Sequence, residues 1–337
     1  MPTSQAVGTN GEQRHAYAIT DEQTPLLPHH DRRKAASAAS SRSISAFLRA
    51  QAFSPLPAFH SDSDPLPSAY LPPLVLQCII TGLADASTFT LTRTWVGFMT
   101  GNMVQMIINT CDVLLPSDSN VDGGAETVGD KLRSNIGSLV GFAIGCQITA
   151  HVIQRLATTR TKRIALVLFS LYRSVATLLI ILLGIRYPAF RLSGSLGWLV
   201  IMILASNLGG QSTYSTSLAT PFSNTVVFTA TLTSVSSDLL LTELHLSSSN
   251  KIKLLSIFGL LGGAALSQFI LKVATTATKG DQHEAVERAL IVLSAAELLL
   301  GLAWFLCGIV DSWRQYRRRS SESTSNGLDE QNEDHLD

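Results

Sequence analysis

A few polar residues lie inside long apolar stretches of this sequence, and their types would suit the binding of a small solute or ion. Thr100-Gly101-Asn102 combines a hydroxyl, an amide and a glycine, which lets the backbone approach a ligand closely. Asp85 lies in the preceding apolar stretch, where a carboxylate costs about 2.5–3.5 kcal/mol and needs a partner in the protein interior. These residues could bind a solute or relay a proton; equally, they could hydrogen-bond to one another and hold helices together.

The second half of the chain carries a related polar set that we include in the same candidate site: Gln211, Thr229 and Thr231. Two more ionisable residues, Arg173 and Glu297, lie near the middle of other apolar stretches. Because a buried charge needs an opposite charge or a hydrogen-bond partner, we expect Arg173 to pair with Glu297, with Asp85 as the alternative partner. Such a pair could be structural, could act as a gate, or could leave Arg173 as an anion site.

Other kinds of chemistry are not indicated by the sequence. The four cysteines form no CxxC pair and the eight histidines form no HxxxH or HExxH spacing, so no metal site and no cofactor is predicted. We find no glycine-rich nucleotide loop and no serine–histidine–aspartate arrangement, so an enzyme is not predicted. Because lysine plus arginine (25) balance aspartate plus glutamate (25), the chain lacks the basic excess of a nucleic-acid-binding protein.

Apolar helices must position these residues. Charged residues make up 15% of the 337-residue chain, well below the roughly 25% of an average soluble domain, and many of them lie in two tails. A membrane-spanning helix needs about 20 apolar residues, and several segments reach that length. They are Leu71–Leu91, Asn135–Leu156, Ile164–Ile185, Leu196–Leu218, Ile252–Val273 and Val286–Val310. The predicted fold class is all-α, a polytopic bundle of about six transmembrane helices whose main partner is the lipid bilayer.

Two shorter apolar stretches, Val96–Leu115 and Thr225–Leu241, could be either full spans or re-entrant segments. Basic loops favour the cytosolic side of a membrane. If both stretches re-enter, the basic loop Arg160–Arg163 lies on the same side as both tails, and the acidic loop Asp118–Asp130 lies on the other side. We therefore predict six spans, with the N- and C-termini in the cytosol.

The order of motifs indicates an internal duplication, with one repeat at 71–185 and a second at 196–310. The run Leu83–Phe89 is similar to Leu208–Tyr214, and Arg173 and Glu297, which are 124 positions apart, mark the last span of each repeat. Because each repeat holds three spans, an odd number, we expect the two to be inverted, as in many transporters. Each repeat also has a stripe of small residues, which we interpret as a helix packing seam. The glycines of the stripes are Gly137, Gly141, Gly145, Gly259 and Gly263.

Two runs in the first repeat carry a family resemblance. Gly82-Leu83-Ala84-Asp85-Ala86, followed by Phe98-Met99-Thr100-Gly101-Asn102, resembles the signature of the YoaK-like family, a domain of unknown function (number 1275). The resemblance covers about residues 71–310 and implies a multi-pass membrane protein without an established activity. The second repeat departs from the family pattern, since Ser212 replaces an asparagine and Ala230-Thr231 replaces Gly-Asn.

Two polar segments, 1–70 and 311–337, flank the apolar domain. They hold too few apolar residues to form a core, so we predict that both are disordered and cytosolic. The run from Glu22 to Leu26-Leu27 fits an acidic dileucine signal, which sorting adaptors bind on the cytosolic side. We therefore expect a sorting adaptor as a partner and a vacuolar or endosomal membrane as the location, with the plasma membrane as the alternative.

The sequence predicts a transporter of an unknown small solute or ion, with a site near the middle of the membrane. One alternative is a membrane scaffold or assembly protein, in which the polar residues only join helices. A weaker alternative is an intramembrane enzyme that modifies lipids.

Overall fold

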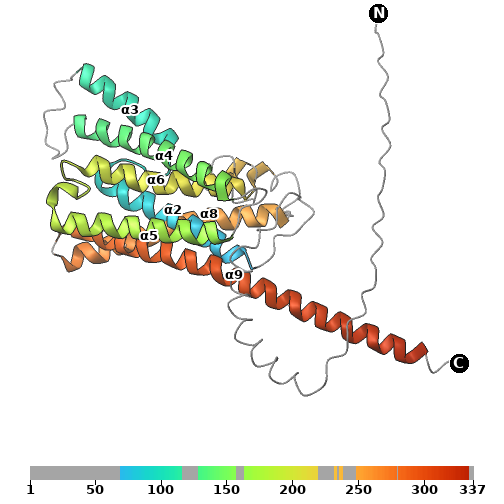
Figure 1. Ribbon diagram of the computed structural model, residues 1–337. Coiled ribbons are helices and arrows are strands. Elements are labelled where there is room, and N and C mark those ends of the chain that lie inside the picture. Colours follow the sequence, from blue (N-terminus) through green and yellow to red (C-terminus); the bar gives the residue numbers. More distant parts are fainter. Residues whose placement is uncertain are drawn as a thin grey trace, which may run out of the picture. The chain divides into compact units, whose positions relative to one another are not determined.

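The regular elements of the described chain are helices, as the sequence predicts. The structure is a computed structural model that describes residues 69–115, 128–156, 163–218, 231–233, 235–237, 248–278 and 280–333. In chain order the elements are α2 (Leu71–Thr92), α3 (Met99–Leu114), α4 (Val128–Leu156), α5 (Arg163–Arg186), the 3₁₀ turn η2 (Pro188–Phe190), α6 (Gly197–Ser217), α8 (Ser248–Ala277) and α9 (Gln282–Glu333) (Figure 1).

Five helices of the described chain, α2, α4, α5, α8 and α9, are long and apolar enough to cross a membrane. They coincide with five of the six predicted spans. Their outward side chains are large and apolar, for example Val140, Val175, Phe258 and Leu298, which is expected where lipid rather than water covers a surface. The chain is therefore a multi-pass membrane protein built as a helix bundle.

The sixth predicted span, Leu196–Leu218, also forms a helix, α6, but α6 does not meet the criterion of length and apolar composition that the other five meet. Its second half contains Asn207, Gly209, Gly210 and Gln211, and all four are buried inside the bundle. A helix surrounded by protein can carry polar side chains that a lipid-facing helix could not. The composition of α6 thus reflects its central position.

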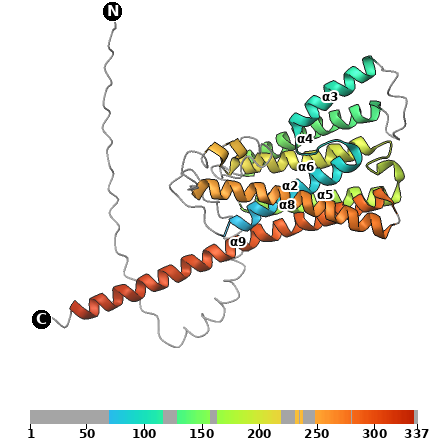
Figure 2. The ribbon, with the colours of Figure 1, turned by 180° about the vertical axis from the view of Figure 1, so that it is seen from behind.

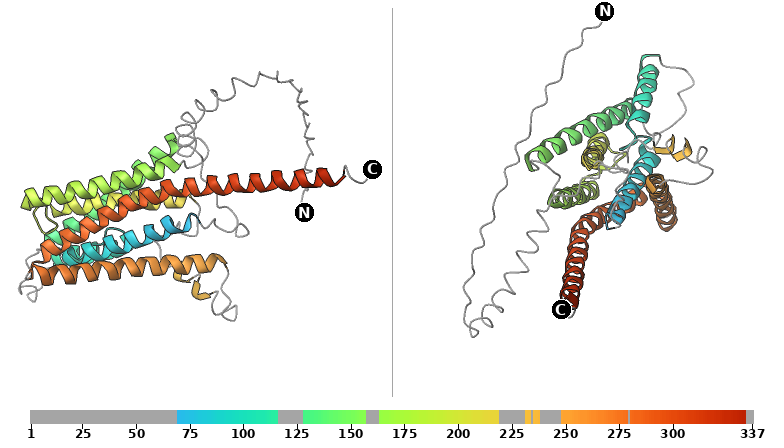
Figure 3. Two further views of the ribbon diagram at one scale, coloured as in Figure 1. Left: turned by 90° about the horizontal axis from the view of Figure 1, so that it is seen from below. Right: turned by 90° about the vertical axis from the view of Figure 1, so that its right-hand side faces the viewer.

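Three helix pairs make the most extensive contacts in the bundle: α4 with α6, α2 with α8, and α5 with α9. Figures 2 and 3 show these helices side by side, with α3 packed on α4. Glycines allow two of these close approaches. A β-carbon on Gly145 would lie 2.0 Å from the carbonyl oxygen of Ser206, and one on Gly263 would lie 2.0 Å from that of Ile79. This is the contact expected of the predicted packing seams.

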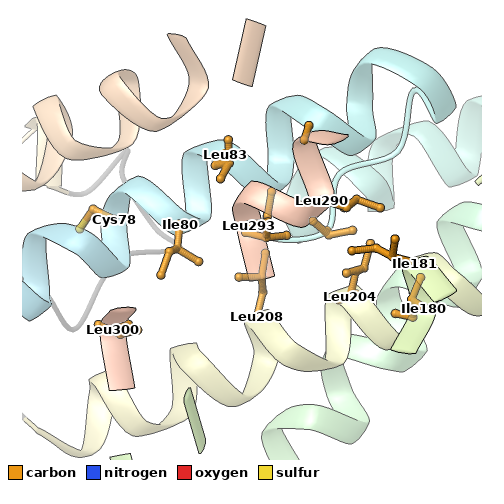
Figure 4. Packing of buried hydrophobic residues seen from close by; sticks show 14 of the residues in the cluster. Cys78, Ile80, Leu83, Ile180, Ile181, Leu204, Leu208, Leu290, Leu293 and Leu300 are labelled. Carbon is orange, nitrogen blue, oxygen red and sulfur yellow. The ribbon is translucent and has the colours of Figure 1, made fainter. Parts of the chain in front are cut away.

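The centre of the bundle is a cluster of aliphatic side chains from α2, α5, α6 and α9. Figure 4 shows Leu83 of α2, Leu208 of α6 and Leu293 of α9 meeting there, and all three are almost completely buried. Polar residues are buried in the same helices. The Arg173 network described below lies in this buried part of the bundle.

The chain breaks between α2 and α3. Arg93, which ends α2, has a left-handed backbone (φ 55°), and its N–H donates to the carbonyl of Phe89 at 3.0 Å. After the break, α3 has 16 residues, a length of about 24 Å, which is shorter than the roughly 30 Å hydrocarbon core. The first ambiguous stretch, Val96–Leu115, therefore forms a break followed by a short helix. Most of the second, Thr225–Leu241, lies outside the described residues.

The two predicted tails have different outcomes. Residues 1–68, which include Glu22, Leu26 and Leu27, lie outside the described residues. At the other end α9 continues to Glu333, through most of the segment 311–337 that we predicted to be disordered. The helix adds residues to an existing membrane helix, which avoids the cost of nucleation, and this segment contains arginine, glutamate and glutamine, which are favourable in helices.

Candidate functional site

Asp85, in α2, holds the break between α2 and α3 in position. Its Oδ1 accepts hydrogen bonds from the backbone N–H groups of Val96, at 2.9 Å, and Gly97, at 2.7 Å. Backbone groups freed by a helix break inside a membrane must be satisfied by the protein, and the carboxylate satisfies two of them. A β-carbon at Gly97 would lie 2.9 Å from Oδ2 of Asp85, so a larger residue here would have to displace the carboxylate.

A cavity of about 450 Å³ lies between α2, α8 and residues 95–98, and Asp85 is part of its wall. This volume is typical of small-molecule sites. Most of the wall is apolar or aromatic, and Asp85 is its one ionisable residue among those described. The lining residues are Thr81, Gly82, Asp85, Ala86, Phe89, Thr90, Trp95, Gly97, Phe98, Leu260, Leu261, Ala264 and Gln268. We call this space the Asp85 cavity.

Asn102 joins the same break to α3 and α4. Its Oδ1 accepts from the backbone N–H of Trp95 at 3.0 Å, and its Nδ2 donates to the carbonyl of Trp95 at 2.6 Å and to Ser138 Oγ at 2.9 Å. Both amide hydrogens are therefore used within the protein. Thr100 is exposed and Gly101 is half-buried. None of the three residues of this motif lines the Asp85 cavity.

Replacing Asn102 with leucine should loosen the break. The change removes the three hydrogen bonds of Asn102. It leaves the N–H of Trp95 unpaired, which costs about 1–3 kcal/mol, while the carbonyl of Trp95 still accepts from Ser138 Oγ at 2.7 Å. We expect a lower thermal unfolding temperature for Asn102→Leu in detergent. Asn109→Leu, a half-buried position on the same helix, is the matched control and should leave it nearly unchanged. Equal unfolding temperatures for the two variants would contradict a clamping role for Asn102.

A second polar group is buried where α5, α6 and α9 meet. Arg173 Nη2 lies 2.9 Å from Glu297 Oε1, and both side chains are only 2% exposed. Arg173 Nη1 donates to Gln211 Oε1 at 2.5 Å, and Thr177 Oγ1 donates to Glu297 Oε2 at 2.9 Å. The predicted pair of Arg173 with Glu297 is thus present, and Asp85 is not the partner of Arg173.

Thr81 connects this network to the Asp85 cavity. Gln211 Nε2 donates to Thr81 Oγ1 at 2.8 Å and to the carbonyl of Gln77 at 3.2 Å, and Thr81 also lines the cavity. Sequence reasoning missed Thr81 and Gln77. The available signal was spacing, because Thr81 precedes Asp85 by four residues and therefore lies on the same helix face.

The predicted binding set is therefore divided. Asp85 lines the cavity, Gln211 belongs to the Arg173 network, and Asn102 holds the break. Thr231 is buried but is not among the residues that line the cavity, and Thr229 lies outside the described residues.

Comparison with known proteins gives one family. The model of a protein family of unknown function, DUF1275, matches residues 74–281, more than half of the chain. The chain belongs to the DUF1275 family. This is the family whose signature the runs at 82–86 and 98–102 resemble, so that recognition is confirmed. No curated protein and no solved structure matches the chain.

The residues matched by the family model include the Asp85 cavity but only part of the Arg173 network. Every described residue that lines the Asp85 cavity in this DUF1275 protein falls within the matched range. Glu297, the acidic partner of Arg173, lies beyond its end, in α9. The cavity is thus built from the part of the chain that defines the DUF1275 family, while the ion pair also uses the helix that follows.

Proposed function

We propose that this protein is a transporter of a small solute or ion and that the solute binds in the Asp85 cavity. The observation that carries the proposal is a carboxylate on a membrane helix that faces a cavity at a helix break. Ionisable residues inside a membrane are costly and commonly belong to a transport pathway. Broken helices are common at the substrate sites of transporters.

The arrangement of helix pairs is compatible with movement around this site. The pair α2–α8 and the pair α4–α6 are each tightly packed, whereas α2 and α6 contact each other much less. Across this weaker contact, Gln211 of α6 donates to Thr81 of α2. We propose that the two pairs rock against each other, with the Arg173–Glu297 ion pair as a latch that Gln211 links to the cavity.

An inverted repeat, which suits such a movement, is part of the proposal and is supported by glycine contacts that recur. In each case a glycine approaches a carbonyl of the neighbouring helix. Three contacts between α4 and α6 each have a counterpart between α8 and α2. Gly141 to Met202 corresponds to Gly259 to Val75; Gly145 to Ser206 corresponds to Gly263 to Ile79; and Gly209 to Phe142 corresponds to Gly82 to Leu260. Every residue of α2 here precedes its counterpart in α6 by 127 positions, and every residue of α4 precedes its counterpart in α8 by 118.

The contact between α5 and α9 supports the same symmetry. Ser174 Oγ donates to the carbonyl of Ser294 at 2.8 Å, and Ser294 Oγ donates to the carbonyl of Ser174 at 3.0 Å. Such a reciprocal contact is expected where a twofold axis passes between two helices. In this register, with an offset of 120, Glu297 corresponds to Thr177 and not to Arg173. Arg173 would correspond to Leu293, one helical turn before Glu297, so the two charged residues would not be at equivalent positions as we predicted from the sequence.

Solvent access to the cavity tests the proposed function. In a background with the four native cysteines replaced, single cysteines are introduced as Ala86→Cys and Ala264→Cys, both in the cavity wall. Val175→Cys, on the lipid-facing surface of α5, is the control. A membrane-impermeant thiol reagent is applied to oriented vesicles from the cytosolic side, where we expect both termini, and separately from the other side.

A transporter should expose both cavity cysteines to the reagent from each side, because each conformation opens the site to one compartment. Val175→Cys should stay unreactive. Reaction from one side only, or from neither side, would overturn the transport proposal. Complete protection would instead favour a scaffold, in which the same polar residues join helices in a dry interior.

A further inference from the structure

We infer that the Asp85 cavity binds an organic ammonium ion, that is, a positively charged nitrogen carrying apolar substituents. This inference rests on the proposed function in that it names the class of solute. The wall of this cavity has one negative charge, three aromatic side chains and few oxygen atoms that could bind a metal ion.

The charge of the cavity wall favours a cation. Asp85 is the one ionisable residue among the described residues of the wall. Its Oδ1 is occupied by two backbone N–H groups, and no residue in the described part of the chain donates a hydrogen bond to Oδ2. The carboxylate therefore has one oxygen left for a ligand, and a ligand with a positive charge would complement it in this apolar environment.

Three aromatic side chains of the wall are arranged next to one another. Phe89 and Trp95 are stacked with ring centroids 4.0 Å apart, and Phe98 meets Trp95 edge-on at 6.0 Å. All three line the cavity together with Asp85. Aromatic faces combined with a carboxylate are the typical environment of a bound ammonium group, because each ring face is electron-rich.

The same aromatic group already attracts a cation of the protein itself. The guanidinium carbon of Arg93 lies 5.7 Å from the centroid of the Phe89 ring. Arg93 does not line the Asp85 cavity but a neighbouring one. The Phe89 ring is thus stacked on Trp95 and also contacted by Arg93, so Trp95 and Phe98 are the rings left to contact a ligand. The cavity itself has no cationic side chain among its described residues.

An inorganic cation suits this cavity less well. Metal cations such as Ca²⁺ require six or more oxygen ligands at about 2.3–2.6 Å. The polar side chains of this wall are Thr81, Asp85, Thr90 and Gln268, spread around a volume of about 450 Å³ whose other lining residues are apolar, aromatic or glycine. An ammonium ion with apolar substituents would fill the space and contact these residues without needing an oxygen shell.

The test compares choline with its neutral carbon analogue, 3,3-dimethylbutan-1-ol, which has nearly the same shape without the charge. Full-length protein in detergent is titrated with each compound, and the thermal unfolding temperature is measured at constant ionic strength. We expect saturable stabilisation by choline and none by the alcohol. The same stabilisation by the alcohol, or by an equal concentration of sodium chloride, would overturn the inference.

Variants locate the binding. Asp85→Asn keeps an oxygen that can accept from Val96 and Gly97 but removes the charge, and it should weaken choline binding at least about tenfold. Glu284→Gln, an exposed carboxylate on α9, is the matched control and should leave binding unchanged. Undiminished binding in Asp85→Asn would overturn the inference.

A second pair of variants keeps the test decisive if Asp85→Asn does not fold. Phe98 lines the cavity but is 44% exposed, so substitutions there should be tolerated. Phe98→Leu should weaken choline binding several-fold, whereas Phe98→Tyr, which keeps an aromatic face, should not. Equal binding by both variants would argue against an aromatic cation site.

Failure of this inference and failure of the proposed function are distinguishable. If Ala86→Cys and Ala264→Cys react from both sides but choline does not bind, the transport proposal stands and the ammonium assignment is wrong. If choline binds and depends on Asp85 but the cysteines react from one side only, the ammonium site stands and the transport proposal is wrong.

Discussion

Arg173→Met is expected to lower stability by about 3–5 kcal/mol, because it leaves the carboxylate of Glu297 buried without its charged partner. Both side chains are 2% exposed, so solvent cannot compensate for the loss. Gln211 also loses the guanidinium that donates to its Oε1. For a domain of this size, 1 kcal/mol corresponds to about 2–4 °C, so the unfolding temperature in detergent should fall by roughly 10 °C.

The double variant Arg173→Met with Glu297→Leu should recover most of that loss. Replacing a whole buried ion pair with apolar residues is often neutral or stabilising, whereas removing one member is not. The control is Arg288→Met, the same substitution in an ion pair with Glu284 in which both side chains are nearly half exposed; it should cost at most about 1 kcal/mol. A double variant as unstable as Arg173→Met would show that the charges are not coupled.

Gly263→Leu is expected to separate α8 from α2. Even a β-carbon at this position would lie 2.0 Å from the carbonyl oxygen of Ile79, and the obstacle is backbone, which cannot rotate away. Overpacking of this kind costs about 1–3 kcal/mol or more. We therefore expect Gly263→Leu to give little folded protein, as judged by size-exclusion chromatography and thermal unfolding in detergent.

The neighbouring glycine supplies a control of identical composition. Gly262 has no atom within 4 Å of the position that a β-carbon would take, and it is exposed on the outer face of α8. Gly262→Leu should therefore fold normally, since leucine is well suited to a lipid-facing position. If the two leucine variants behaved alike, the packing of α8 on α2 through Gly263 would be incorrect.

The apolar length of the sequence is enough to predict the helix bundle, because each membrane helix must be about 20 residues long and satisfy its own backbone. It is not enough to assign the broken part of the chain. Val96–Leu115 is long and mostly apolar, but the carboxylate of Asp85 and the amide of Asn102 hold residues 95–97 out of a helix. Such contacts join residues that are 7 to 12 positions apart, beyond the reach of a helical pattern.

The sequence is enough to choose candidate residues but not to show how they group in space. The sequence identifies Asp85, Gln211 and Arg173 because polar residues are rare in apolar stretches. It does not reveal that Gln211 contacts Arg173 and Thr81 and that neither Gln211 nor Asn102 lines the cavity. Those relations depend on which helices pack together, and a single sequence carries no direct record of contacts between residues 38 or 130 positions apart.

The polar, central helix α6 has a consequence for how the protein is made. A segment of its composition is a poor substrate for the translocon, since each polar residue raises the free energy of insertion from water into lipid. Its main packing partner, α4, is synthesised earlier, so α6 would enter the membrane against helices that are already inserted. We expect a chain that lacks α4 to leave α6 outside the bilayer. Because two spans would then be missing, α5 would insert with reversed orientation, whereas α8 and α9 would keep theirs.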